Sequence, residues 1–431
     1  MIQKLHRLSE GISKPAQQFL KTDIRYLASG SFWLTVGKVA SIGVAFVLSV
    51  LYARYLSKEL YGDYRYILSV IGMFTVFSLS DIGVAITRAV ARGKTQAFRR
   101  GTAVMFFSSF GMTIATLGAA VFFGYRGTAP LAWGFAATAL LIPFVEGLGT
   151  WHAYLDGKKQ FRQKTIYNIA SQIFYGTCMT LTVVYIYMAH TPPWISLALL
   201  AGIYYLAHAL PNIFLSLYVM RSVPASYAPQ EEQDAIRYGV HLSLIKIPTT
   251  IANYIDSVLL YTYLGGAQLA LYSFALAPTE QIKALLGNAA SVGFPKLSEK
   301  TSTPEHMANL KKTLPVKMLK ASLLTSLIVI LYILAAPLFF QIFFPRYTAS
   351  VAYSQIIALS LAFFPLNIFG TALKAEGDLK KIYIFQVAPP IVQILLFLLL
   401  IPSFHLWGAV IGKVAGRLTN HLIQAFLYMR T

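Results

Sequence analysis

The segment HLSLIKIPTTIANYIDSV, residues 241–258, is apolar enough to lie in a membrane and yet carries ionisable groups. Lys246, Asn253 and Asp256 fall at helical spacing, with two threonines between them. Residues three and four apart share one face of a helix, so the segment predicts a helix with a single polar stripe. A lysine or aspartate at mid-membrane costs roughly 2.5–3.5 kcal/mol on translocon scales. We therefore expect the stripe to face the protein interior or a watery cavity.

Apolar segments of similar length recur along the chain. The 431 residues are 56% hydrophobic and 12% charged, against roughly 25% charged residues in soluble proteins. About 20 apolar residues cross a bilayer as a helix. The sequence therefore predicts an all-α integral membrane protein with twelve transmembrane helices. The predicted spans are 28–55, 64–88, 102–124, 131–155, 165–189, 194–220, 240–264, 270–295, 316–344, 350–373, 382–402 and 406–429.

A weak internal repeat indicates two lobes. A shift of 208 residues places Lys38 on Lys246 and YLSKELYGDY (55–64) on YLGGAQLALY (263–272). Six spans in each half give a parallel, pseudo-two-fold repeat about an axis along the membrane normal, as in rocking transporters. The predicted organisation is a cytoplasmic N-terminal tail (1–26), an N-lobe with spans one to six (27–221), a cytoplasmic linker (222–239) and a C-lobe with spans seven to twelve (240–431).

Basic residues in the loops predict the orientation. Twenty-five Lys and Arg residues fall on the side of the N-terminus and five on the other side. The five are Arg54, Lys58, Arg65, Arg126 and Arg346. Cytoplasmic loops carry the excess of Lys and Arg, so we expect both termini in the cytoplasm. Most of the formal net charge of +20 is then this excess of basic residues, which faces anionic lipid. Binding to nucleic acid is not needed to explain it.

Charged residues within the predicted spans are candidates for function, because such groups are expensive in a membrane. Each has a plain structural alternative. Lys246 can reach the headgroups, Asp81 can pair with Arg88, and Glu280 can pair with Lys283 three residues on. Lys413 and Arg417 share a face of the last span, where packing between lobes and a cationic patch are equally plausible.

Other kinds of chemistry have no support in the sequence. A single cysteine and scattered histidines form no metal-binding pattern, and no GxxxxGK[ST] phosphate loop is present. We expect no cofactor and no metal. Without an ATP site of the phosphate-loop kind, the energy for any movement of a substrate must come from the substrate gradient or from a coupled ion, H⁺ or Na⁺.

Several motifs carry a family resemblance. They are LYARYLSKELYGDYRYILSVIGMFTVFSLSDIGVAITRAVARGK (51–94), YIDSVLLYTYLG (254–265) and FPKLS (294–298). Together they resemble bacterial polysaccharide flippases, the O-antigen and exopolysaccharide transporters of the multidrug/oligosaccharidyl-lipid/polysaccharide exporter superfamily. In the first motif the likeness rests on Tyr55 to Tyr64, on Asp81 with Gly83, and on the basic loop after them. Ser57-Lys58 stands where the family often has Gly-Pro.

The resemblance implies a flippase of the bacterial inner membrane. It moves an undecaprenyl-pyrophosphate-linked oligosaccharide repeat unit of O-antigen, capsule or exopolysaccharide from the cytoplasmic to the outer leaflet by ion-coupled alternating access. The substrate-binding candidates are Lys38, Lys246, Asn253, Lys283, Arg88 and Arg417, and Lys38 and Lys246 would grip the pyrophosphate from opposite lobes. The ion-coupling candidates are Asp256, Glu146, Glu280 and Asp81. Besides the lipid-linked oligosaccharide we expect membrane lipids and a polysaccharide polymerase as partners, no nucleic acid, and a monomer.

Two alternatives remain open. One is a multidrug or cation antiporter of the same superfamily, and the other is a membrane-embedded glycosyl- or acyltransferase. A strongly positive central cavity favours the pyrophosphate-linked glycan, whereas a negative cavity favours export of cations.

Overall fold

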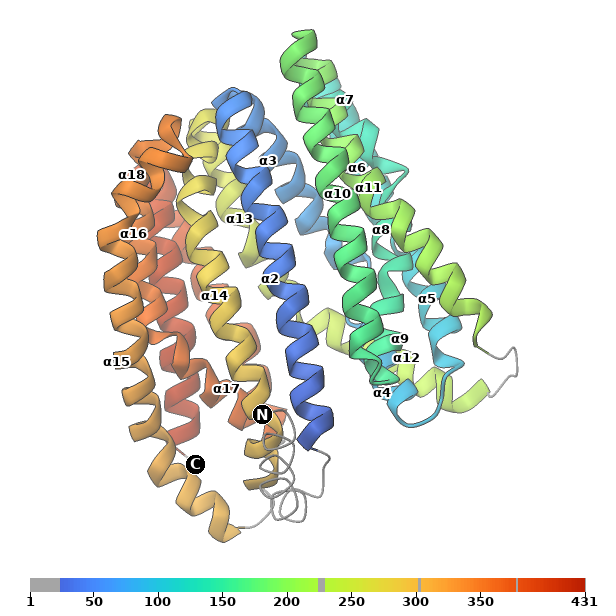
Figure 1. Ribbon diagram of the computed structural model, residues 1–431, viewed down its shortest axis with the longest axis vertical. Coiled ribbons are helices and arrows are strands. Elements are labelled where there is room, and N and C mark those ends of the chain that lie inside the picture. Colours follow the sequence, from blue (N-terminus) through green and yellow to red (C-terminus); the bar gives the residue numbers. More distant parts are fainter. Residues whose placement is uncertain (1–23, 224–228, 301–303, 377–378, 431) are drawn as a thin grey trace, which may run out of the picture.

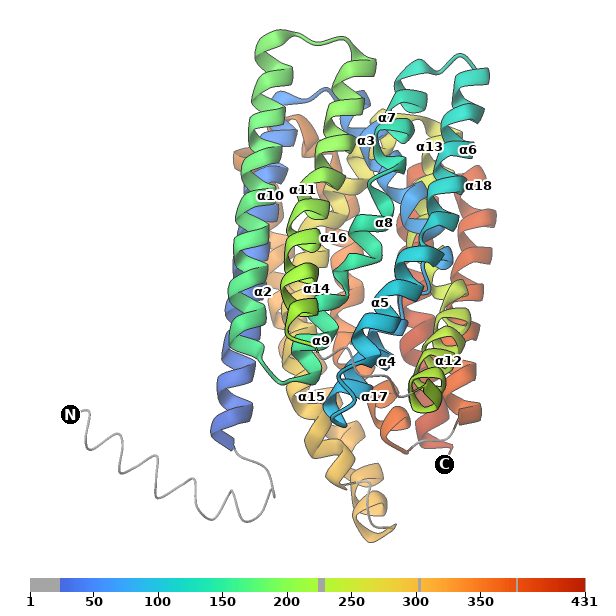
Figure 2. The ribbon, with the colours of Figure 1, turned by 90° about the vertical axis from the view of Figure 1, so that its right-hand side faces the viewer.

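The computed structural model describes residues 24–223, 229–300, 304–376 and 379–430. The described residues form helices joined by short connections and contain no strand, so the all-α prediction is confirmed. Figure 1 shows α5–α11 on one side of the molecule and α14–α18 on the other, with α2 and α3 between them. The first and last described residues lie at the same end of the molecule in both ribbon views (Figure 2).

The N-terminal half holds α2 (Ile24–Tyr55), α3 (Lys58–Phe74), α4 (Ile82–Ala91), α5 (Ala97–Ser108), α6 (Phe110–Tyr125), α7 (Ala129–Ala139), α8 (Ile142–Glu146), α9 (Trp151–Gly157), α10 (Phe161–Ala189) and α11 (Pro193–Arg221). The C-terminal half holds α12 (Pro229–Ile245), α13 (Ile247–Leu264), α14 (Gly266–Lys300), α15 (Pro304–Phe343), α16 (Val351–Leu359), α17 (Asn367–Glu376) and α18 (Leu379–Met429). Short 3₁₀ turns (η1 at Thr75–Phe77, η2 at Leu148–Thr150, η3 at Pro345–Ser350 and η4 at Ser360–Leu366) join some of them.

The predicted spans all fall on helical segments, although several are broken. Span two bends by 57° between α3–η1 and α4, and span four bends by 48° between α7 and α8–α9. In the described part of the chain, seven helices are long and apolar enough to cross a membrane, or nine if each bent pair is one span. The number of twelve crossings therefore stays a prediction.

The two last predicted spans are the arms of one hairpin. Helix α18 is interrupted at His405, whose φ of 54° is incompatible with a right-handed helix. The arms then pack closely together, because an added side-chain carbon at Gly412 would lie 2.7 Å from Phe397 and one at Gly416 would lie 2.6 Å from Gln393. Small residues in one arm thus permit the close approach of the other.

Helix α12 occupies part of the segment predicted as a linker. It begins at Pro229, and proline is well suited to the first helical position. The following residues, QEEQDA, are mostly helix-compatible. Helix α12 packs against α4 of the N-terminal half, where an added carbon at Gly239 would lie 2.8 Å from Cα of Ile82. The second half of the predicted linker is therefore helical, and around Gly239 this helix packs against α4.

The two halves meet tightly near the start of α3. An added carbon at Gly62 would lie 1.9 Å from the carbonyl oxygen of Gly266, so only glycine fits there. Nearby, the hydroxyl of Tyr261 donates to Asp63 at 2.8 Å, and Tyr66 stacks on Tyr261 with ring centroids 3.9 Å apart. These contacts between α3 and the α13–α14 turn lie toward the end of the molecule that is uppermost in Figure 1.

Candidate functional site

A cavity of about 1350 Å³ lies between the two halves. Its walls come from α2, α3, α10 and α11 on one side and from α12, α13, α14 and α18 on the other. The residues predicted from the sequence that line it are Lys246, Asn253, Lys283, Arg417, Asp256, Glu280 and Asp81. The polar stripe of residues 241–258 thus faces a cavity, as its spacing predicts.

The other three predicted residues lie elsewhere. Lys38 is on α2 but does not line the cavity, so the structure does not bring the proposed Lys38–Lys246 pair to one site. Glu146 ends the short helix α8, outside the lining. The guanidinium of Arg88 lies over the ring of Tyr238 at 5.1 Å. The expected contact between Asp81 and Arg88 was wrong, because Asp81 pairs with Lys246 instead.

The Asp81–Lys246 pair joins the two halves. Nζ of Lys246 donates to Asp81 at 3.0 Å, with 47% of the lysine side chain exposed. The hydroxyl of Ser243 accepts the backbone N–H of Asp81 at 3.1 Å. Lys246 stands at the break between α12 and α13, which frees its side chain to reach α4. An exposed pair such as this one contributes little stability.

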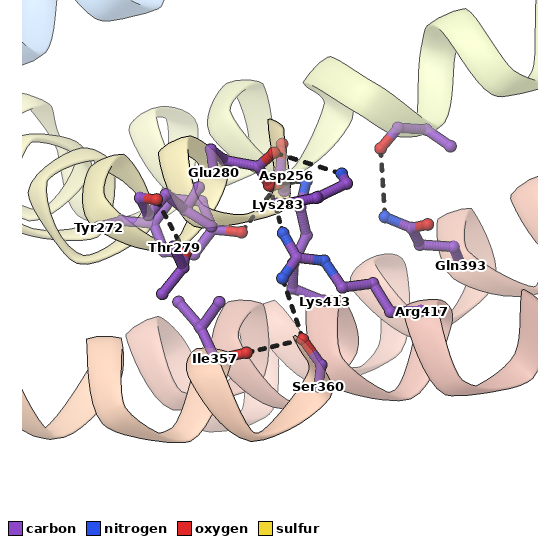
Figure 3. A network of polar contacts seen from close by, with 12 residues as sticks. Asp256, Tyr272, Thr279, Glu280, Lys283, Ile357, Ser360, Gln393, Lys413 and Arg417 are labelled. Atoms are coloured by element: carbon purple, nitrogen blue, oxygen red, sulfur yellow. Dashed lines mark hydrogen bonds and ion pairs between the residues drawn. The ribbon is translucent and has the colours of Figure 1, made fainter. Parts of the chain in front are cut away.

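Asp256 is enclosed by hydrogen-bond donors (Figure 3). Its side chain is 1% exposed and accepts from Nζ of Lys413 at 2.7 Å, from the hydroxyl of Tyr272 at 2.8 Å and from the backbone N–H of Ser257 at 2.8 Å. Both carboxylate oxygens are therefore occupied. A buried charge is tolerated only when it is paired and hydrogen-bonded in this way.

Glu280 has a different environment, although it is close by in the same cavity (Figure 3). It pairs with Lys283 at 3.2 Å, which confirms that expectation, and with a guanidinium nitrogen of Arg417. The other terminal nitrogen of Arg417 donates to the hydroxyl of Ser360 at 2.9 Å. Glu280 and Lys283 are each 40% exposed, whereas Arg417 is 11% exposed. Two cations thus share one open carboxylate.

Arg65 is the cavity residue that the sequence interpretation missed. In the sequence it counts among the basic residues of the outer side, at the very start of predicted span 64–88, whereas it lies two turns inside α3, roughly 10 Å from the start of the helix. Ser57 caps α3 by accepting from the N–H of Leu60, and Glu59 stands in the first turn. This capping pattern is the signal that would have extended the span toward its N-terminus.

Tyrosines surround Arg65 in the cavity, and no described carboxylate pairs with it. Its buried Nε has no hydrogen-bond partner, and the ion pairs of the described residues do not include it. The tyrosines that line the cavity with it are Tyr52, Tyr61, Tyr64, Tyr175, Tyr204, Tyr238, Tyr254 and Tyr383. Phenol groups offer hydrogen bonds and ring faces but no counter-charge at neutral pH. Arg65 is half-buried, and no anion of the described residues neutralises its charge.

The described lining of the cavity carries a positive charge excess. Five basic residues line it: Arg65, Lys246, Lys283, Lys413 and Arg417. Three carboxylates, Asp81, Asp256 and Glu280, oppose them. A cavity between low-dielectric walls concentrates such an excess, so the site attracts anions and repels cations.

The same fold occurs in transporters of known structure. A structure named lipid II flippase MurJ in an inward closed conformation aligns with a TM-score of 0.69 at 12% identity, over 93% of this chain and 87% of its own. An inward-facing multidrug resistance MATE family transporter of the MOP superfamily aligns with a TM-score of 0.64 at 15% identity, over 91% and 94%. A MOP superfamily transporter from Pyrococcus furiosus aligns with a TM-score of 0.60 at 14% identity, over 93% and 95%. No curated protein sequence is detectably similar.

The apolar helices define a multi-pass membrane protein, which has the fold of the transporters just named and a charged cavity between its two helical halves. A family model for polysaccharide biosynthesis proteins matches residues 27–300. The chain belongs to the polysaccharide biosynthesis protein family, and the resemblance noted in the sequence is confirmed.

Proposed function

We propose that the protein flips an undecaprenyl-pyrophosphate-linked oligosaccharide from the cytoplasmic to the outer leaflet of a bacterial inner membrane. The observation that carries the proposal is Arg65, a half-buried cation in the cavity that pairs with no carboxylate of the described residues. An anionic group of the cargo supplies the missing counter-charge. The positive excess of the whole lining acts in the same direction.

The physical problem that such a protein solves is desolvation. Polar sugars and a charged pyrophosphate cannot enter hydrocarbon without losing their hydration. The free-energy cost of this desolvation is greatest for an isolated charge. A cavity with guanidinium and ammonium groups replaces water around the phosphates. Tyrosine hydroxyls and rings offer hydrogen bonds and apolar faces to sugars. The lipid tail stays in the bilayer.

Export of a cationic drug is the second candidate, because a MATE transporter shares the fold. The positive charge excess of the cavity disfavours it, since a cation would meet five basic residues and three carboxylates. For the transporter from Pyrococcus furiosus, the structure is described as having a reversed polarity of the binding pocket that suggests a different function. Charge in the pocket is therefore the property on which function within this fold is best judged.

Ion coupling belongs to the proposal as well. Asp81 and Glu280 open into the cavity, and Glu146 lies half-buried in the N-terminal half, so each offers a carboxylate for H⁺ or Na⁺. Asp256 is fully engaged by Lys413, Tyr272 and Ser257, which makes it the weakest of the four candidates.

A transport assay with purified protein tests the function. In proteoliposomes, we expect transfer of a fluorescent disaccharide linked through pyrophosphate to a short isoprenoid, measured by quenching from the outside. The same disaccharide on an uncharged linker should move at least about tenfold more slowly, because contacts to a charged group are worth 1.5–3 kcal/mol. Lys38→Ala and Lys246→Ala show in this assay whether either lysine contributes. Equal rates for both linkers, or transport of a cationic dye instead, would contradict the proposal.

The proposed orientation has its own test. In a Cys178→Ala background, a cysteine at Gly127 should react with an impermeant thiol reagent in intact cells. A cysteine at Gln160 should react only after the membrane is opened, because the basic loop around it is predicted to be cytoplasmic. Reaction of the Gln160 cysteine from outside would reverse the orientation and the proposed direction of transport.

A further inference from the structure

Glu280 is a carboxylate held only by side chains that the proposed cargo would need. Its ion-pair partners among the described residues are Arg417 and Lys283, and 40% of its side chain is exposed. We propose that Glu280 is a tethered substitute for the anionic group of the cargo: it neutralises Arg417 and Lys283 while the cavity is empty and is displaced when the cargo binds. This inference rests on the proposed function, because it presupposes an anionic ligand.

The geometry around Arg417 supports an exchange of anions. The guanidinium is anchored at one terminal nitrogen by Ser360, whose hydroxyl in turn donates to the carbonyl of Ile357 at 2.6 Å. The other terminal nitrogen faces Glu280, and the buried Nε has no partner. Arg417 therefore keeps its position when Glu280 leaves. A phosphate oxygen can take the vacated place with a similar charge-assisted hydrogen bond.

The other carboxylates of the cavity do not fit this role. Asp256 is 1% exposed and accepts from a backbone N–H and from Tyr272 as well as from Lys413, so its departure would leave several donors unsatisfied. Asp81 is bound to Lys246, away from Arg417 and Lys283. Glu280, three residues before Lys283 in α14, can swing into the open cavity without breaking a backbone contact.

The exchange has a consequence for both ends of the transport cycle. In the empty cavity, Glu280 lowers the cost of holding two cations close together. When the cargo is bound, the displaced carboxylate stays tethered nearby and competes to return. Glu280 thus weakens binding and speeds release, which a transporter requires as much as affinity.

Binding of geranyl pyrophosphate to purified protein tests the inference. By calorimetry, Glu280→Gln should bind the probe about tenfold more tightly than the unmodified protein, since one competing charged contact is removed. In the vesicle assay the same variant should turn over more slowly. Glu59→Gln is the matched control, because Glu59 is exposed on α3 and does not line the cavity. Asp81→Asn removes another cavity carboxylate and controls for charge alone.

The outcomes separate the inference from the proposed function. Tighter binding in Glu280→Gln alone supports displacement. An unchanged or weaker affinity in Glu280→Gln, with normal binding by the unmodified protein, overturns the inference and leaves the function standing. An equal gain in Asp81→Asn also overturns it, because general electrostatics then suffices. If neither the unmodified protein nor any variant binds the probe, the anionic cargo and the inference fall together.

Discussion

Arg65→Gln should remove most pyrophosphate binding without lowering the thermal stability of the protein. A charge-assisted contact to phosphate is worth roughly 1.5–3 kcal/mol, so the affinity for geranyl pyrophosphate should fall about ten- to a hundredfold. The melting temperature should stay the same or rise. The reason is that Arg65 pairs with no carboxylate of the described residues, so the substitution breaks no described ion pair, and the buried Nε without a hydrogen-bond partner is a cost in the empty protein.

Three measurements make this result decisive. Binding is measured by calorimetry, stability by thermal denaturation of the purified protein, and function by transport in vesicles. Arg65→Lys should recover part of the binding, because it keeps the charge but loses the planar fork of donors. Arg126→Gln, at an exposed position after α6, should change nothing. A lower melting temperature with unchanged probe binding would show that Arg65 stabilises the fold instead.

Asp256→Asn should have the largest effect on stability. Removing one partner of a buried ion pair costs about 3–5 kcal/mol, because the other charge is left uncompensated. Lys413 is 12% exposed and would lose its only carboxylate contact among the described residues. Tyr272 and the N–H of Ser257 would also lose an ionised acceptor. We expect a marked fall in melting temperature and in the amount of protein in the membrane.

The double variant Asp256→Asn/Lys413→Met distinguishes the structural role from ion coupling. If the cost comes from an uncompensated lysine, removing that lysine should restore part of the lost stability, since apolar replacements of buried pairs are often tolerated. Glu146→Gln, which breaks no ion pair of the described residues, should keep normal stability. Normal abundance of Asp256→Asn combined with transport that no longer responds to an ion gradient would instead assign Asp256 to coupling.

Much of the architecture follows from local patterns in the sequence. Apolar length and the spacing of polar residues predict where helices lie, because both are properties of a few consecutive turns. The stripe through Lys246, Asn253 and Asp256 was placed correctly on a cavity wall for this reason. The pair Glu280–Lys283 was also predictable, because the two residues are three apart on one helix.

Contacts between distant segments were not predictable in the same way. Asp81 pairs with Lys246 and not with Arg88, and Asp256 pairs with Lys413, 157 residues away. Which charged residues form pairs depends on how helices from the two halves pack. Local patterns in the sequence do not show that packing. The repeat matched Lys38 to Lys246, yet only the second reaches the cavity.

The sequence by itself determined the membrane class, the positions of the helices and the presence of costly charges inside them. Tertiary structure decided which of those charges are neutralised and which are not. Arg65 illustrates the difference: its residue type and helix were in the sequence, but the absence of a carboxylate partner within the described part of the chain appears only when α3, α10, α11 and α13 surround it with tyrosines. Burial and counter-charge are properties of all the groups around a site, and those groups come from helices far apart in the chain.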